Sequence, residues 1–129
     1  MITSLRNAVF TKTKGIFSER LYFAQAPEET QYPYGVFSEL PGFVDRDSVS
    51  RYEFVIIQIN GYSKQLEPLE TIEAQLKALL DRSQASFNLT DYYVIDVDWI
   101  FSRTAILDTR PEGTFQFTHQ YRFHLQLKD

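Results

Sequence analysis

Two carboxylates are the residues of this chain whose type and spacing could most readily do chemistry. Asp96 and Asp98 are two positions apart, and in a strand such residues point to the same face, roughly 7 Å apart. A carboxylate pair can bind a divalent cation or act as general acid and base. The alternation with Val97 and Trp99 is also typical of a solvated strand face. We therefore expect solvated side chains here, and no metal or cofactor site.

The two histidines do not strengthen a metal site. His119 falls among the odd-numbered, apolar positions of the last segment, and His124 among its even-numbered, polar positions. Side chains of opposite parity leave a strand on opposite faces, so both imidazoles cannot reach one ion. We expect His119 to be half-buried with one hydrogen-bond partner. Asp96, Asp98 and His124 remain the best set for an alternative hypothesis, a small α+β domain that binds or converts a small ligand.

Composition argues against other kinds of chemistry. The chain has no cysteine, which excludes thiolate nucleophiles, disulfides and sulfur-ligated zinc. It has neither a Gly-x-Ser-x-Gly motif nor a glycine-rich phosphate loop, and only five glycines. A net charge of −4 opposes binding of nucleic acid through a broad basic surface, and the polar row of the last strand lacks stacking aromatics. No apolar run is long enough to span a membrane. We predict that the protein is not an enzyme.

The elements that must position these residues follow from hydrophobic periodicity. Between Phe115 and Leu127 the odd positions are apolar except His119, and the even positions are polar, which predicts a strand with one buried face. Leucines and an isoleucine spaced three and four apart predict a helix over 66–80. Further elements are expected at 2–14 (helix) and at 21–26, 34–40, 51–62 and 92–103 (strands). In the strand at 92–103, we expect a buried face made of Tyr93, Ile95, Val97, Trp99 and Phe101.

These elements predict an α+β fold for residues 1–129 as a single domain. Short connections between consecutive strands favour antiparallel neighbours. We expect one twisted antiparallel sheet of about five strands with two helices packed on one face, in the order α-β-β-β-α-β-β.

Several segments, taken in order, indicate a family. They are Ile16-Phe17, Leu21-Tyr22-Phe23, Pro33 to Phe37, Ile57 to Ser63 running directly into the helix at 66–80, the Asp108 to Gly113 loop, and Arg122-Phe123. In this order and spacing, nearly the whole chain resembles the tail terminator, or tail completion, proteins of long-tailed bacteriophages, similar to the lambda minor tail protein U class.

The resemblance implies a structural role without catalytic residues. Such proteins form a ring, expected here as a hexamer, that caps the tail tube, ends its polymerisation and provides the surface for head attachment. The implied partners are further copies of the chain, the tail tube protein and a head-completion or connector protein, while DNA passes through without specific binding. The implied location is the tail-neck region of a virion assembled in the host bacterial cytoplasm. A head-closure or connector ring protein of the neck is the alternative within this class.

Charged and apolar loop residues are the candidates for ring contacts. We expect an interface that includes Phe43, Val44, Asp45, Arg46, Asp47, Arg103 and Arg110. Glu28 and Glu29 are expected on an acidic surface at the lumen, where like charge keeps DNA from adhering.

Overall fold

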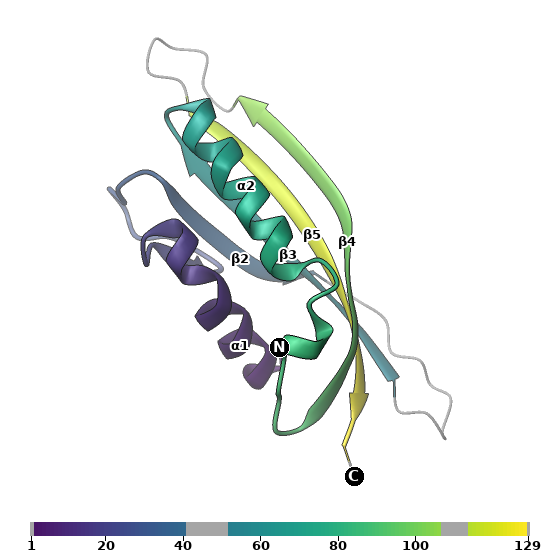
Figure 1. The fold of residues 1–129 in the computed structure, drawn as a ribbon. Helices are drawn as coiled ribbons and strands as arrows, with labels where there is room; N and C mark the ends of the chain where they lie inside the picture. Colours follow the sequence, from purple (N-terminus) through teal and green to yellow (C-terminus); the bar gives the residue numbers. More distant parts are fainter. Residues whose placement is uncertain (1, 41–51, 107–113, 129) are drawn as a thin grey trace.

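Two α-helices lie on one face of a five-stranded sheet in the computed structural model, which describes residues 2–40, 52–106 and 114–128 (Figure 1). The predicted α+β class and element order are confirmed. The elements are α1 (Thr3–Thr13), β1 (Leu21–Phe23), β2 (Tyr34–Leu40), β3 (Tyr52–Ser63), α2 (Leu66–Leu80), β4 (Tyr92–Ile106) and β5 (Phe115–Leu127), with short 3₁₀ segments at Lys14–Phe17 and Gln84–Ser86.

The strand order across the sheet is β1-β2-β3-β5-β4. The pairs β2–β3, β3–β5 and β5–β4 are antiparallel, as predicted, but β1 and β2 are parallel. The expectation of a wholly antiparallel sheet was therefore wrong at this edge. Residues 24–33 form a loop long enough to return the chain to the starting end of β1, whereas a tight turn would have forced an antiparallel pair.

The core lies between the sheet and the two helices. Leu5 and Val9 of α1 and Leu76 of α2 are fully buried in one core cluster with odd-numbered side chains of β5 and β3. From Phe117 to Leu125, β5 follows the predicted alternation of buried and half-buried residues. The other face of the sheet, called the outer face below, has no helix over it within the described residues (Figure 1).

The alternation in β4 is broken, and here the sequence prediction was wrong. Only Val97 of the five residues predicted to share a buried face is buried. Two β-bulges insert Ile95 and Ile100 as unpaired residues opposite β5, and each extra residue reverses which face the following side chains occupy. Consequently Tyr93 and Phe101 lie on the outer face, while Val97 and Trp99 face the helices.

Candidate functional site

Asp96 and Asp98 lie together on the outer face, as the alternation predicted. Asp96 stands opposite His124 and Asp98 opposite Arg122 in the β4–β5 register. The Nδ1 atom of His124 is 3.9 Å from Oδ2 of Asp96. Arg122 donates from Nη2 to Oδ2 of Asp98 at 3.4 Å, and Nε of Arg82 is 3.8 Å from Oδ1 of the same carboxylate. Each aspartate therefore faces its own cationic or imidazole partner, and the two do not converge on a common point.

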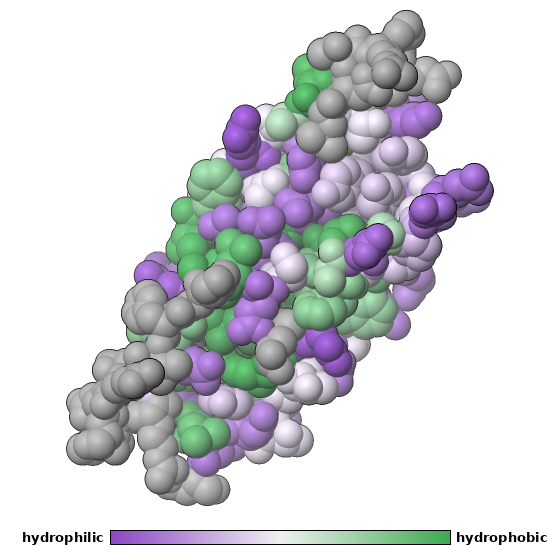
Figure 2. All heavy atoms as spheres, turned by 180° about the vertical axis from the view of Figure 1, so that it is seen from behind, coloured by the Kyte–Doolittle hydropathy of each residue, from purple (hydrophilic) through white to green (hydrophobic). Residues whose placement is uncertain are grey.

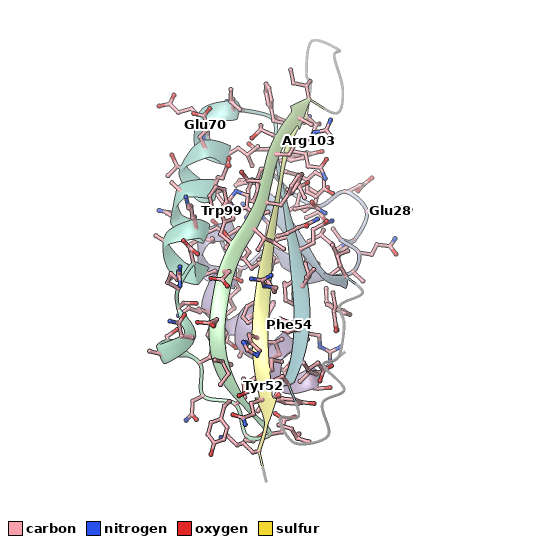
Figure 3. The ribbon with its side chains drawn as sticks, turned by 90° about the vertical axis from the view of Figure 1, so that its right-hand side faces the viewer. Glu28, Tyr52, Phe54, Glu70, Trp99 and Arg103 are labelled. Atoms are coloured by element: carbon pink, nitrogen blue, oxygen red, sulfur yellow. The ribbon has the colours of Figure 1, made fainter. Side chains whose placement is uncertain are left out.

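His124 is held by aromatic contacts. Its ring stacks on Phe54 with centroids 4.5 Å apart and lies 4.8 Å from Tyr52, and Figure 3 labels both side chains. Its Nε2 atom is buried and has no hydrogen-bond partner among the described residues. Within the described residues no group of three His, Cys, Asp or Glu side chains could hold a metal ion. The structure thus brings Asp96 to His124 but gives this set no convergent geometry.

Hydrogen bonds between β3 and β5 occupy the middle of the outer face. Thr118 donates from Oγ1 to Oδ1 of Asn60 at 2.7 Å, and Gln120 donates from Nε2 to Oε1 of Gln58 at 3.0 Å. Figure 2 looks onto this side of the molecule and shows hydrophobic residues interspersed among polar ones. Because these polar side chains form hydrogen bonds with one another across the strands, they already use part of their capacity to bind a ligand at the middle of the face.

Two surface cavities of about 370 and 300 Å³ do not involve the candidate chemistry either. The first lies between α1 and the segment 86–88, and the second beside Pro33 and Pro68. Neither is lined by Asp96, Asp98 or His124. In the described part of the chain, no helix has the length and hydropathy needed to cross a membrane.

His119 is fully buried and has two partners, where one partner and half-burial were expected. Its Nδ1 is 2.8 Å from the hydroxyl of Tyr121, and its Nε2 is 3.0 Å from Oε1 of Glu73 on α2. Burial lowers the pKa of His119; the Glu73 carboxylate opposes this and the nearby Lys77 ammonium adds to it. Burial also raises the pKa of Tyr121. The sequence could not reveal this network, because Glu73 is brought to the imidazole only by the packing of α2.

The most conspicuous surface feature is the edge of the sheet formed by β4. On its free side, β4 has no strand partner among the described residues. Six large hydrophobic side chains of this strand are 37–59% exposed, and we call them the β4 edge patch: Tyr93, Ile95, Trp99, Ile100, Phe101 and Ile106. A monomeric protein normally protects an open edge with charges or a covering element, and a cluster of exposed apolar side chains marks an interaction surface.

Arg103 is the only predicted interface residue that the structure describes, and it is exposed beside the β4 edge patch. It lies on the outer face, opposite Thr118. Phe43, Val44, Asp45, Arg46, Asp47 and Arg110 lie outside the described residues. Sequence analysis missed the β4 edge patch itself, because it assigned four of the six residues, Tyr93, Ile95, Trp99 and Phe101, to a buried face and did not assign Ile100 or Ile106 to any surface.

The opposite edge of the sheet is formed by β1 and the loop 24–33. Glu28 and Glu29 in this loop are exposed, and Figure 3 shows the Glu28 loop on the side of the sheet away from α2. Phe23 and Tyr32, 40% and 37% exposed, give this edge an apolar component as well.

Comparison with known proteins identifies the fold but no family. No family model matches the sequence, and no curated protein sequence is detectably similar to it. Among solved structures, a chain of one described as "Virion of native gene transfer agent (GTA) particle" aligns with a TM-score of 0.75, over 95% of both chains and at 12% identity. The class defined by this two-helix, five-stranded fold thus includes a chain found in a virion particle.

Proposed function

We propose that this protein is a structural component of a phage-like virion, and specifically a tail terminator. In this role it forms a ring that caps the tail tube, ends tube polymerisation and provides the head-joining surface. Two likenesses support the role: the resemblance of the sequence to tail terminator proteins, and the fold shared with a chain of a gene transfer agent virion.

The β4 edge patch is the observation on which the proposal chiefly rests. A ring subunit needs two lateral surfaces that are stable in isolation and adhesive in the assembly. A contact between two different surfaces of identical chains closes into a ring when its rotation fits. The fifteen residues of β4 extend over roughly 50 Å. An edge of this length is long enough to supply one side of a stable interface, in which each partner buries roughly 800 Å².

The outer-face geometry supports a non-enzymatic role. Asp96 and Asp98 have separate partners, His124 for the first and two arginines for the second, and they line neither cavity described above. We propose that the protein acts through surface complementarity with further copies of itself, six in the expected ring, and with the tail tube protein and a head-completion protein. DNA then passes through the ring without specific binding, in the tail-neck region of a virion assembled in the bacterial cytoplasm.

Mass measurement of the purified protein, alone and after mixing with tail tubes, tests the proposal. We expect a species of six times the 15.1 kDa chain mass, either in solution or at tube ends. A protein that stays monomeric and ignores tubes contradicts the proposal. Binding to the portal complex in place of tubes would instead assign the chain to the connector proteins of the neck.

A further inference from the structure

We infer that the β4 edge of one copy binds the β1 edge of the next copy, in a head-to-tail contact in which Arg103 meets Glu28 and Glu29. Here the β1 edge means β1 together with the loop 24–33. The inference rests on the proposed ring and names the two surfaces that the ring would join.

The two edges match in apolar character. The β4 edge patch includes Ile100 and Phe101, which are 42% and 43% exposed, and the β1 edge exposes Phe23 and Tyr32 to a similar extent. Joining the two edges would remove all four side chains from water, and apolar burial is the main driving force of association.

The two edges also match in charge. Arg103 on β4 and Glu28 and Glu29 in the loop are exposed, and no ion pair joins any of the three to another described residue. Opposite charges placed across an interface fix its register and disfavour wrong pairings.

The register of the sheet places the charged groups at compatible positions. Arg103 pairs with Thr118, Thr118 with Asn60, Asn60 with Val36, and Val36 with Tyr22 of β1. This row crosses the whole sheet on its outer face, so Arg103 and β1 stand at the same level along the strands. The Glu28 loop lies on that same side of the sheet (Figure 3). A neighbour placed beside β4 in the same orientation therefore brings its acidic loop toward Arg103.

The shapes of the edges favour contact through side chains over a continuous β-ladder. Two bulges, at Ile95 and Ile100, interrupt β4, and bulges twist an edge away from extended pairing. On the other side β1 has three residues and is followed by Ala24 at a φ of 67°. A symmetric β4–β4 contact would close into a dimer and leave Phe23 and Tyr32 uncovered.

A charge exchange tests the contact. Arg103→Glu should weaken self-association by about a hundredfold, because it places like charges together, and the double variant Glu28→Arg with Glu29→Arg should do the same. An equimolar mixture of the two variant proteins should recover the ring mass, since every contact in an alternating ring again pairs opposite charges. Urea unfolding checks that both variants fold.

Cross-linking provides an independent readout, because the natural chain has no cysteine. We expect Phe23→Cys and Ile100→Cys, mixed and treated with a short thiol cross-linker, to give a mixed dimer. The control is Glu70→Cys on α2, which should give none with either variant. Self-linking of Ile100→Cys alone, or cross-linking of Ile100→Cys only to the tube protein, overturns the inference.

The outcomes separate this inference from the proposed function. If the natural protein forms rings that neither charge variant disturbs, the edge assignment is wrong and the proposed function stands. If the natural protein forms no ring with or without tubes, both fail. Success would also move Glu28 and Glu29 from the lumen, where the sequence prediction put them, to the contact between subunits.

Discussion

Replacing Gly61 with alanine should destabilise the fold through a single aromatic ring. Gly61 lies in β3 directly opposite Phe117 of β5, on the face covered by the helices. A Cβ atom at this position would collide with Cε2 of the Phe117 ring and would lie 2.5 Å from Cζ and 2.8 Å from Cδ2. Carbon atoms in contact normally stand roughly 3.5–4.0 Å apart, so either the ring or the strand must move.

The ring has little freedom to move. Phe117 is fully buried, and it packs against Phe17, with centroids 6.3 Å apart, and against His119, at 5.1 Å. Overpacking a dense core typically costs about 1–3 kcal/mol. Because the clash involves three ring atoms and the ring is enclosed, we expect a loss of about 3 kcal/mol in the free energy of unfolding, or about 10 °C in Tm.

Urea unfolding followed by circular dichroism measures this loss. Gly15→Ala is the matched control, because an added Cβ there would meet no side chain of a non-adjacent described residue within 4 Å, and it should change stability by less than about 0.5 kcal/mol. Adding Phe117→Leu to Gly61→Ala should recover part of the loss, giving a coupling energy in a double-mutant cycle. An unchanged midpoint for Gly61→Ala, or equal losses at both glycines, would refute the reasoning.

Three further predictions concern protonation, assembly and the candidate set of Asp96, Asp98 and His124. Burial lowers the pKa of His119 from its ordinary 6.5, so the unfolded chain binds a proton at this imidazole more readily than the folded chain does. The contribution of His119 to the free energy of unfolding is therefore present above about pH 6.5 and is lost as the pH falls below that value. Urea midpoints between about pH 8 and about pH 5 should therefore depend less on pH in His119→Asn, and equal slopes would contradict the prediction. Ile100→Asp should leave the monomer's unfolding free energy within about 0.5 kcal/mol of the natural protein but remove the ring-sized species from a mass measurement; a persisting ring would count against the β4 edge patch. Asp96→Ala and Asp98→Ala should leave that species in place, whereas loss of assembly in either would show that the outer-face ion pairs take part in it.

The sequence predicted the elements whose patterns are local and uninterrupted. The alternation in β5 needed no knowledge of its neighbours, because one face is buried from Phe117 to Leu125, and a one-residue slip would turn that whole set outward. The same holds for the stripe of α2 that begins at Leu69. The aspartates of β4 were placed on the correct face, because Asp96, Val97 and Asp98 lie between the two bulges.

What the sequence could not predict depends on contacts between distant segments. Both bulges of β4 fall within a stretch rich in apolar residues on either side of Val97, so no polar residue signals the change of parity. The parallel pairing of β1 depends on the path of the loop 24–33. The second partner of His119 arrives on α2, 46 positions away in the sequence. The β4 edge patch could not be predicted for the same reason, because only the strand order shows that β4 is an edge strand.

Growth of tail tubes in the presence of this protein tests the central claim most directly. Tube subunits polymerised with increasing amounts of the protein should give shorter tubes, each carrying a ring of density at one end under the electron microscope, and Ile100→Asp should restore the uncapped length. Tubes that grow to the same length, with bare ends at every concentration of the natural protein, would contradict the account.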